Sequence, residues 1–386
     1  MSVQVLINGS FWAEPDVGSG QYLHGLVRWL PRVAPQHRYI LLTPSPASAV
    51  PPPPHGVRLL RVRPPTTRLG ANVAKLAFEQ LALPWAVQRL TNRREPAVLF
   101  VPYFAPPCYA PVPVVTTVGD IIPLILPEYR GGLHVRAYMS LVKRAVRQSK
   151  HVLTFSMRSR DDIVTHLRMS SARVTPVLLA AGDQYQPGDK EVARAEVARR
   201  YGLTEPFIYY VGGLDARKNL TVLLQAFALL RARGVRATLA IAGRLLGHDR
   251  RLFPDLDGLI AELELTTAVR RIHVPTEDGP LLYQACTVFA FPSRYEGFGL
   301  PPLEAMACGA PVVVSNASSL PEVVGPAAIR VPPDDVVGWV AALARVLGDD
   351  RLRAELQAQG LAQAARFSYR QVARETIAVL EAVASA

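Results

Sequence analysis

The sequence predicts an α/β protein with two domains, each built around a parallel β-sheet. Short apolar runs alternate with helix-like segments along the whole chain, and this alternation starts afresh after residue 205. The pattern is typical of βαβ units, in which helices connect parallel strands that are buried on both faces. The 386 residues suffice for more than one domain, because a domain commonly takes about 150 residues.

In the first domain, the predicted strands are apolar runs rich in Val, Ile and Leu, which favour buried strands. They span residues 3–7, 39–42, 57–62, 98–101, 114–118 and 151–155. The segments between them have the apolar spacing of helices. These helices are expected at residues 20–30, 71–90, 133–148 and 159–167.

The second domain repeats the pattern. Strands are expected at residues 207–211, 238–242, 269–274, 288–291, 312–315 and 328–331. Helices are expected at residues 191–201, 219–233, 255–264, 278–285, 302–308, 336–347 and 350–365. Asn219 is expected to cap the helix that follows it, because its side chain can accept from free backbone amides.

The first domain is expected to span residues 1–182 and the second residues 190–367. The stretch 181–188 between them is polar and contains Gly and Pro, which is typical of a connection. A second break near Phe367 precedes a last helical segment, residues 368–386. We expect this segment to pack back on the first domain.

The chain carries 43 Lys and Arg against 31 Asp and Glu, a formal net charge of +12. Such a charge favours polyanionic partners, namely phosphate groups, anionic lipids or nucleic acid. The basic residues lack a nucleic-acid reading motif, so nucleic acid is not expected. Residues 133–150 instead form a basic amphipathic pattern, which is either a solvated helix face or a surface for peripheral contact with an anionic membrane.

Three cysteines without CxxC spacing indicate neither a disulfide framework nor a zinc ribbon. The N-terminus has no basic region followed by an apolar run, and no stretch is apolar for long enough to span a membrane. We therefore expect a cytoplasmic protein, in contact with the inner membrane face at most peripherally.

The strongest chemical signal is a glycine-containing loop between a buried strand and a helix, FPSRYEGFGLPPLEAMACGAPVV at residues 291–313. Such a loop lies at the carboxyl edge of a parallel sheet, where the amides of a helix N-terminus can bind phosphate. Glu296 and Glu304 flank it, and a carboxylate can accept two hydrogen bonds from neighbouring sugar hydroxyls. From the residues alone, two surface glutamates around a tight turn are an equally good interpretation.

A second such pattern, YYVGGLDARKNL at residues 209–220, places Arg217 and Lys218 at a turn. Two cations there can neutralise a diphosphate, although a solvated basic helix start has the same composition. A third pattern, GSGQY, puts Gly18 and Gly20 where a loop opens a helix. It lacks the third Gly and the acidic residue of a dinucleotide fingerprint, so it indicates only a close approach of backbone to a ligand.

Together these stretches resemble the retaining glycosyltransferases of family four, the group 1 glycosyl transferases. Glu296 and Glu304 match the E-x7-E signature within EGFGLPPLEAMACGAPVV, and VGGLDARKNL resembles the donor-diphosphate turn. GSGQY and VTTVGDIIPLILPEY resemble stretches of the acceptor domain, and SNASSLPEVVGPAA resembles a loop on the donor side. The resemblance covers nearly the whole chain in order. It implies the GT-B fold, in which two Rossmann-like domains face each other across a cleft and the acceptor domain comes first.

The resemblance also implies roles for individual residues. Glu296 should face the donor sugar, and Glu304 should hold the nucleotide ribose. Lys218, with Arg217, should hold the donor diphosphate, and neither a metal nor another cofactor is expected. Further donor contacts are expected from the residues Phe298, Gly299, Leu300, Ser319, Leu320, Gly18 and Gly20.

Two positions depart from the family's pattern. Gly119 stands where members often carry a His near the transferred sugar, which leaves Asp120 as the polar group there. Gly213 stands where many carry an Arg, whose place Arg217 can take. Asp255-Leu-Asp257 matches the DxD metal signature of the other glycosyltransferase fold, but a helix cap is the better interpretation.

The predicted function is retaining transfer of a hexose from a GDP- or UDP-linked sugar to a glycan or polyprenyl-linked acceptor. The motifs look most like those of mannosyltransferases in surface polysaccharide assembly, so GDP-mannose is the first choice of donor. Gly119 in place of His leaves a non-catalytic nucleotide-sugar-binding protein as one alternative. A GT-B epimerase is another, while the incomplete fingerprint disfavours an NAD dehydrogenase.

Overall fold

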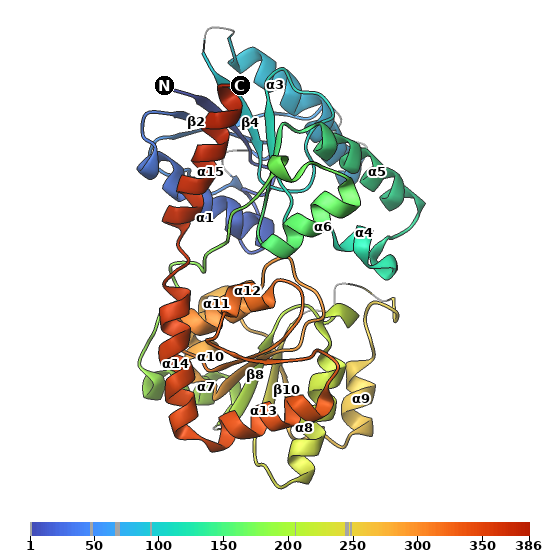
Figure 1. The fold of residues 1–386 in the computed structure, drawn as a ribbon, viewed down its shortest axis with the longest axis vertical. Coiled ribbons are helices and arrows are strands. Elements are labelled where there is room, and N and C mark those ends of the chain that lie inside the picture. The colour runs from blue at the N-terminus through green and yellow to red at the C-terminus, as the bar shows by residue number, and fades with distance from the viewer. Residues whose placement is uncertain are drawn as a thin grey trace. The chain divides into compact units, whose positions relative to one another are not determined.

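The computed structural model describes residues 2–46, 49–65, 70–92, 95–204, 206–243, 247 and 249–386 (Figure 1). It divides into two compact units, of which unit 1 comprises Met1–Leu179 and Ser368–Ala386, and unit 2 comprises Ala180–Phe367. Each unit is built around a parallel β-sheet, which confirms the predicted fold class of two α/β domains. Among the described residues, no helix is both long and apolar enough to cross a lipid bilayer.

The sheet of unit 1 has the strand order β3-β2-β1-β4-β5-β6-β7. Its strands are β1 (Gln4–Asn8), β2 (Arg38–Thr43), β3 (Val57–Arg61), β4 (Ala97–Val101), β5 (Val114–Thr117), β6 (His151–Thr154) and β7 (Val174–Pro176). In the central register, Leu6 lies opposite Ile40 on one side and Leu99 on the other. The strands β1 and β4 are buried throughout, as their apolar sequences predict. The sequence prediction lacks β7, whose three residues form no apolar run.

The helices of unit 1 are α1 (Gly18–Val33), α2 (Ala71–Ala77), α3 (Leu83–Leu90), α4 (Ile122–Ile125), α5 (Leu133–Gln148), α6 (Met157–Leu167) and α15 (Tyr369–Ala384). The predicted helix over residues 71–90 is continuous, but a π-helical segment, Phe78–Ala82, joins α2 to α3. The short helix α4 is an addition, because its single turn is too short to show helical periodicity.

The last helix, α15, packs along α1 within unit 1 (Figure 1). The Tyr369 hydroxyl donates to the Gln21 carbonyl at 3.4 Å, and Nε2 of His37 lies 2.8 Å from Oε1 of Glu381. Gly25 permits the close approach, because a Cβ at that position would overlap the Tyr369 ring. The C-terminal segment thus belongs to unit 1, although the chain has passed through unit 2 before it.

The sheet of unit 2 has the order β10-β9-β8-β11-β12-β13. Its strands are β8 (Phe207–Val211), β9 (Thr238–Ala242), β10 (Val269–Ile272), β11 (Val288–Phe291), β12 (Val312–Ser315) and β13 (Ile329–Val331). Its helices are α7 (Lys190–Tyr201), α8 (Leu220–Ala232), α9 (Leu256–Glu262), α10 (Gly279–Ala285), α11 (Leu300–Ala307), α12 (Leu320–Val324), α13 (Val336–Gly348) and α14 (Asp350–Ala364). The sequence prediction lacks only α12 among these elements.

One local prediction in unit 2 is wrong. Asn219 does not cap α8 through its side chain, and its backbone adopts a left-handed conformation with φ of 59°. Its side-chain amide instead donates to the Pro333 carbonyl at 2.6 Å. The residue therefore fixes the turn before α8 to the loop before α13, a contact between segments far apart in the sequence.

Candidate functional site

The site in unit 2 begins where two neighbouring strands of the sheet end. The chain runs from β8 to β9 on one side, whereas β11 leads to β12 on the other, so the strand order reverses between β8 and β11. Ligands of open α/β sheets bind outside the carboxyl ends of the strands at such a switch point. The backbone amide of Arg294, after β11, donates to the Arg217 carbonyl, after β8, at 2.8 Å. The two loops are therefore held together by their own backbone.

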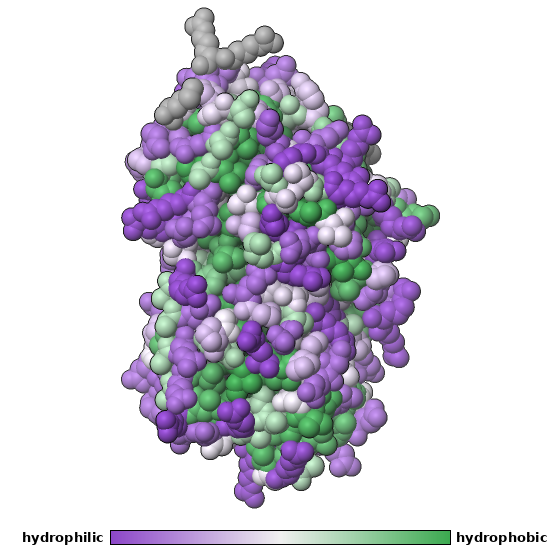
Figure 2. Space-filling model, in the orientation of Figure 1, coloured by the Kyte–Doolittle hydropathy of each residue, from purple (hydrophilic) through white to green (hydrophobic). Residues whose placement is uncertain are grey.

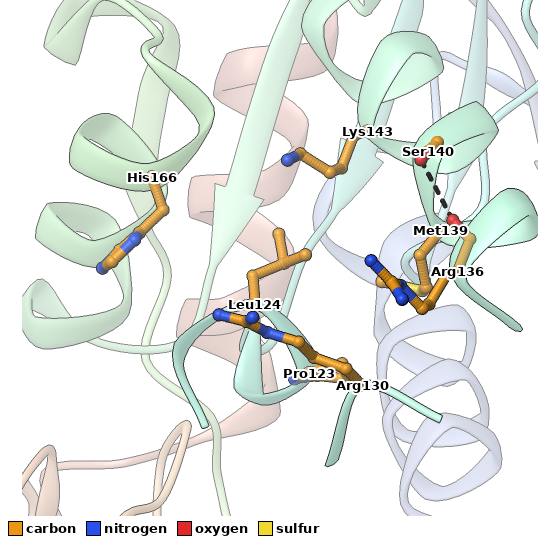
Figure 3. Close-up of a pocket in the computed structure, with 8 residues that line it drawn as sticks. All are labelled: Pro123, Leu124, Arg130, Arg136, Met139, Ser140, Lys143 and His166. Atoms are coloured by element: carbon orange, nitrogen blue, oxygen red, sulfur yellow. Dashed lines mark hydrogen bonds between the residues drawn. The ribbon is translucent and has the colours of Figure 1, made fainter. Parts of the chain in front are cut away.

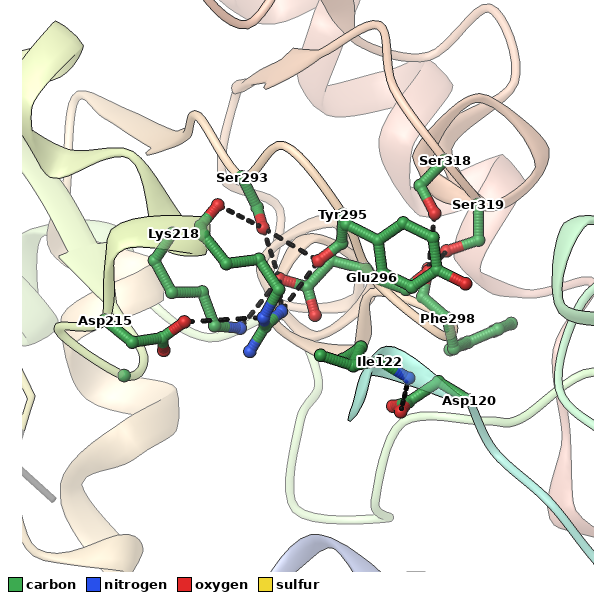
Figure 4. A network of polar contacts seen from close by, with 12 residues as sticks. Asp120, Ile122, Asp215, Lys218, Ser293, Tyr295, Glu296, Phe298, Ser318 and Ser319 are labelled. Atoms are coloured by element: carbon green, nitrogen blue, oxygen red, sulfur yellow. Dashed lines mark hydrogen bonds and ion pairs between the residues drawn. The ribbon is translucent and has the colours of Figure 1, made fainter. Parts of the chain in front are cut away.

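Three side chains from these loops converge on one carboxylate oxygen, Oε1 of Glu296 (Figure 4). Nζ of Lys218 donates to it at 2.7 Å, and Oγ of Ser293 donates at 2.6 Å. Nη1 of Arg217 lies 3.0 Å from the same oxygen, and its Nε lies 3.4 Å from Oδ1 of Asp215. The structure thus brings together the predicted residues Lys218, Arg217 and Glu296.

The charges of this cluster nearly cancel. Burial opposes ionisation of Glu296, but the cations Lys218 and Arg217 outweigh burial and lower the pKa of Glu296 below its usual value. Nζ of Lys218 also lies 5.0 Å from the centre of the Phe291 ring, within reach of a cation–π contact. The two cations that the sequence analysis assigns to a diphosphate are therefore already paired with a carboxylate.

The loop that carries Glu296 is fixed by the segment before α12. Oγ of Ser318 donates to the Glu296 carbonyl at 2.7 Å, and Oγ of Ser319 donates to the Phe298 carbonyl, also at 2.7 Å. Gly299 is required here, because its φ is 115° and a Cβ would lie 2.6 Å from Cδ2 of Leu320. The helix α11 then begins at Leu300 without a side-chain cap. Pro301 and Pro302 have no backbone N–H, and the Leu303 amide donates to the Gly299 carbonyl at 3.5 Å, so the Leu300 amide is the one in the first turn that can donate to a ligand.

Glu304 lies on α11 in a different environment. Its Oε2 accepts from the Tyr283 hydroxyl at 3.1 Å, and it is also hydrogen-bonded to the Tyr185 side chain. Burial raises the pKa of Glu304 to about 7. Its two tyrosine partners are not part of the Glu296 cluster, so the two glutamates have separate surroundings. Tyr185 escapes sequence reasoning because it lies in a stretch whose composition indicates only a connection.

In unit 1, the structure places the predicted glycines at the start of α1. Gly18 has open space around it, whereas a Cβ at Gly20 would overlap the carbonyl of Glu14. Gly20 is therefore required by the fold of its own chain, whatever else it contacts. The Oδ1 atom of Asp120 accepts at 3.2 Å from the amide of Ile122, the residue at which α4 begins.

The space beside Gly119 is filled by Phe155. A Cβ at Gly119 would lie 2.7 Å from Cε2 of the Phe155 ring, and that ring packs edge-on against Tyr22 with centroids 4.9 Å apart. A His at this position would need the ring to move. Gly119 and Phe155 thus form a matched pair, and sequence reasoning misses Phe155 because the two positions are far apart in the chain.

Gly213, where many family members carry an Arg, also has a neighbour in the place of a side chain. The DxD stretch at Asp255 is a helix cap. A Cβ at Gly213 would lie 2.7 Å from Oδ2 of Asp215. Oδ1 of Asp255 accepts from the Gly258 amide at 2.9 Å, and Asp257 pairs with Arg271 at 2.9 Å. In the described part of the chain, no three His, Cys, Asp or Glu side chains gather as metal ligands would. The prediction that no metal is needed stays a prediction.

Comparisons with known proteins identify the family of the chain. The model of the family described as "Glycosyl transferases group 1" matches residues 194–363. The chain is 37% identical over 266 residues to O-antigen chain mannosyltransferase B of Escherichia coli, which covers 68% of each protein. It is 31% identical over 265 residues to the serotype-specific mannosyltransferase WbdA of Escherichia coli, which covers 67% of this chain and 32% of that protein.

Solved structures share the fold over almost the whole chain. Sucrose-phosphate synthase from Thermosynechococcus elongatus superposes with a TM-score of 0.72 at 21% identity, covering 99% of this chain and 98% of that one. HepE of Anabaena, solved with UDP and glucose, superposes with a TM-score of 0.73 at 16% identity, covering 98% and 99%. At such identities the likeness concerns the fold alone.

Proposed function

The chain belongs to the group 1 glycosyl transferases and is a glycosyltransferase, and we propose that it transfers a hexose with retention from a nucleotide sugar to a glycan or polyprenyl-linked acceptor. The observation that carries the proposal is the pair of cations, Lys218 and Arg217, at the switch point of unit 2. Mannose from GDP-mannose is the first choice of donor. Two relatives named as mannosyltransferases, one of them of the O-antigen chain, support mannose and surface polysaccharide assembly.

The donor diphosphate would replace Glu296 as the partner of the two cations. A diphosphate carries more charge than a carboxylate and offers more acceptor oxygens, so it competes well for Lys218 and Arg217. Glu296, once released from part of its ion pairing, can accept from the hydroxyls of the sugar. Glu304 would accept from the ribose hydroxyls in place of the tyrosines.

The remaining donor contacts would come from backbone and loop residues. The amides of the loop from Phe298 to Leu300 lie at the start of α11, where helix amides favour a phosphate or sugar oxygen. Ser319 and Leu320 hold that loop from the side of α12. From unit 1, the start of α1 with Gly18 and Gly20 would line the phosphate side, and Asp120 would be the polar group nearest the transferred sugar.

The anomeric configuration of the sugar is retained if the acceptor attacks the anomeric carbon on the same face from which the diphosphate leaves. The bond between the anomeric carbon and the diphosphate oxygen breaks, the acceptor oxygen bonds to that carbon, and its proton passes to the departing diphosphate. Lys218, Arg217 and the amides of the loop from Phe298 to Leu300 stabilise the negative charge that develops on the diphosphate. No metal or other cofactor is required for this role.

The acceptor is proposed to lie on the side of unit 1, with peripheral contact at an anionic membrane surface on the cytoplasmic side. The helix α5 is basic, and Leu133 in its first turn is 78% exposed. Figure 2 shows hydrophobic (green) atoms among hydrophilic (purple) ones at the edge of unit 1 where Figure 1 draws α5. Flotation with anionic vesicles at low salt tests this contact. A protein that stays unbound would contradict the proposed membrane contact.

A transfer assay tests the proposal. GDP-mannose, GDP-glucose, UDP-glucose and UDP-galactose would be offered with mannose-containing oligosaccharides, and the anomeric configuration of the product would be read by NMR. We expect α-linked product from GDP-mannose and loss of turnover in Lys218→Met. Saturable donor binding without any transfer would instead favour the non-catalytic alternative, for which the filled space at Gly119 is the structural argument.

A further inference from the structure

A basic pocket of about 270 Å³ opens on unit 1 between α4, the segment after it, α5 and α6 (Figure 3). Its polar side chains are Arg130, Arg136, Ser140, Lys143 and His166. Its floor is apolar, formed by Pro123, Leu124 and Met139, and none of its described lining residues carries a carboxylate. The sequence analysis singled out the basic segment but not this pocket.

The three permanent cations of the pocket have no carboxylate partner among the residues that the structure describes. Within the described residues, none of Arg130, Arg136 and Lys143 forms an ion pair with a carboxylate, whereas the basic residues Arg158 and Arg160 on α6 pair with Asp162 and Asp161. Like charges gathered without partners repel one another and weaken the fold. Such an arrangement is typical of a site whose ligand supplies the missing negative charge.

The helix α5 directs this charge into the pocket. Arg136, Ser140 and Lys143 follow one another at helical spacing and therefore share one face. The opposite face, with Val142, Ala145 and Val146, is buried in the core and fixes the orientation of the helix. Figure 3 shows Arg136 and Lys143 extending from α5 toward the side on which Leu124 and Arg130 lie.

The same helix shows which basic residues are used for structure instead. Nε of Arg147, one turn beyond Lys143 on that face, donates to the Leu167 carbonyl at 2.8 Å and ties α5 to the end of α6. Arg144 and Lys150 are exposed and do not line the pocket. Arg130 and Arg136 are exposed as well and Lys143 is half-buried, so the pocket cations differ from Arg144 and Lys150 in lining one pocket and not in their exposure.

We propose that this pocket binds a phosphate or diphosphate group. Pockets for whole organic ligands usually measure about 300–1,000 Å³, so the volume suits an anionic group better than a complete nucleotide sugar. Arginine presents paired N–H donors that match phosphate oxygens. The group can come from a lipid headgroup or from a soluble phosphate ester, and the two sources share the same chemistry.

The place of the pocket connects it to the acceptor. The pocket residues Pro123 and Leu124 belong to α4, and Asp120 accepts at 3.2 Å from the amide of Ile122, the first residue of that helix. A ligand phosphate held against α4 would therefore anchor an acceptor, or its carrier, on the side of Asp120. This last step rests on the proposed function, whereas the anion site itself does not.

Calorimetry with inorganic diphosphate tests the site. The background is Lys218→Met, which removes the proposed donor site of unit 2 from the measurement. Arg136→Ala with Lys143→Ala is compared with Arg144→Ala with Lys150→Ala, which removes the same charge from the same segment outside the pocket. We expect the pocket variant to bind inorganic diphosphate at least about tenfold more weakly than its control, because two charge-assisted contacts to phosphate oxygens are lost. Equal affinities in the two variants would overturn the site.

Two further readouts keep the test decisive. The melting temperature of the pocket variant should not fall below that of its control, because removing unpaired like charges relieves repulsion; a marked fall would mean that the side chains serve the fold.

Cosedimentation with phosphatidylglycerol vesicles, compared with phosphatidylcholine vesicles, shows whether the bound phosphate belongs to a lipid headgroup or to a soluble ester. Weaker vesicle binding of the pocket variant than of its control assigns a lipid headgroup, whereas a loss of diphosphate binding alone assigns a soluble ester. Failure of the wild type to bind any nucleotide or nucleotide sugar, with diphosphate binding at the pocket intact, would contradict only the proposed function.

Discussion

Lys218 and Glu296 form a buried ion pair in which Nζ lies 2.7 Å from Oε1, and the two side chains are 11% and 12% exposed. A buried charge that loses its partner destabilises a protein strongly, so each group stabilises the other until a ligand arrives. A donor diphosphate that binds here must exchange one partner for another. Under the proposed function, Glu296 would therefore compete with the diphosphate and, once displaced, would accept hydrogen bonds from the sugar.

Replacing this carboxylate should separate nucleotide binding from transfer. In Glu296→Gln, Lys218 and Arg217 lose their competing anion, so we expect GDP or UDP alone to bind about three- to tenfold more tightly, which is about 1 kcal/mol. Sugar transfer should fall, because the amide of Gln accepts hydrogen bonds from the sugar hydroxyls more weakly than the carboxylate of Glu296 does. Calorimetry and the transfer assay measure the two effects. Asp334→Asn, which removes an exposed carboxylate paired with Arg294 at 2.7 Å, is the control, and weaker nucleotide binding in Glu296→Gln would contradict the exchange.

The raised pKa of Glu304 predicts a pH dependence of stability. Its pKa is about 7 in the folded protein and 4.5 in the reference state, so the folded protein holds the proton more tightly. The stability that protonation of Glu304 contributes is present below about pH 4.5 and is lost as the pH rises to about 7. Across that window the loss amounts to about 3 kcal/mol. Glu304→Gln should remove this slope from denaturant unfolding measured between pH 5 and 8.

A matched variant separates this effect from the general loss of a carboxylate. Glu262 is exposed on α9, so Glu262→Gln should leave the pH slope as in the wild type. If Glu304→Gln keeps the wild-type slope as well, Glu304 is ionised in the folded protein throughout this range. The assigned cause, burial beside two tyrosines, would then be wrong.

Gly299 should be intolerant of any side chain. Its φ of 115° strains an L-residue, and a Cβ would lie 2.6 Å from Cδ2 of Leu320. We expect Gly299→Ala to lower the free energy of unfolding by about 1–3 kcal/mol and to weaken nucleotide binding, because the loop amides from Phe298 to Leu300 shift. Gly348→Ala is the control, since nothing lies within 4 Å of a Cβ there. A Gly299→Ala protein as stable as this control would contradict the account.

The pair Gly119 and Phe155 predicts a coupling. Gly119→His should lower the free energy of unfolding by about 1–3 kcal/mol, because its Cβ would lie 2.7 Å from the Phe155 ring. In Phe155→Ala the ring is absent, so the same His should cost less. A double-mutant cycle on the free energy of unfolding measures the difference, and strictly additive effects would show that the two positions do not contact. Gly132→His, at a position with open space, controls for the His itself.

The fold could be predicted to a large extent because each strand shows itself in its own local run of apolar residues. Buried runs such as Phe207–Val211 and Val288–Phe291 fall where their apolar residues indicate, since both faces of a parallel strand are covered. Short elements escaped prediction, as β7 and α12 are too brief to show periodicity. The predicted helix cap at Asn219 was wrong because the side chain bonds to Pro333, a residue 114 positions away that no local pattern indicates.

The site could be predicted only in its parts. The residue types and spacings of Lys218 and Glu296 indicate a donor site, but 78 residues separate the two, and no local pattern shows that they pair. Tyr185 and Phe155 carry no chemical signature of their own. Their importance arises from contacts with Glu304 and Gly119 that only the folded chain brings about.

The most direct test of the central claim, that Lys218 and Arg217 hold a nucleoside diphosphate, is calorimetric titration of GDP, UDP and ADP and their common sugars. The wild type is compared with Lys218→Met and with Arg294→Gln, whose exposed guanidinium is already paired with Asp334. We predict saturable binding of one nucleotide series, weakened about ten- to a hundredfold in Lys218→Met and little changed in Arg294→Gln. Equal affinity in the wild type and Lys218→Met, or no binding of any nucleotide to the folded protein, would contradict the claim.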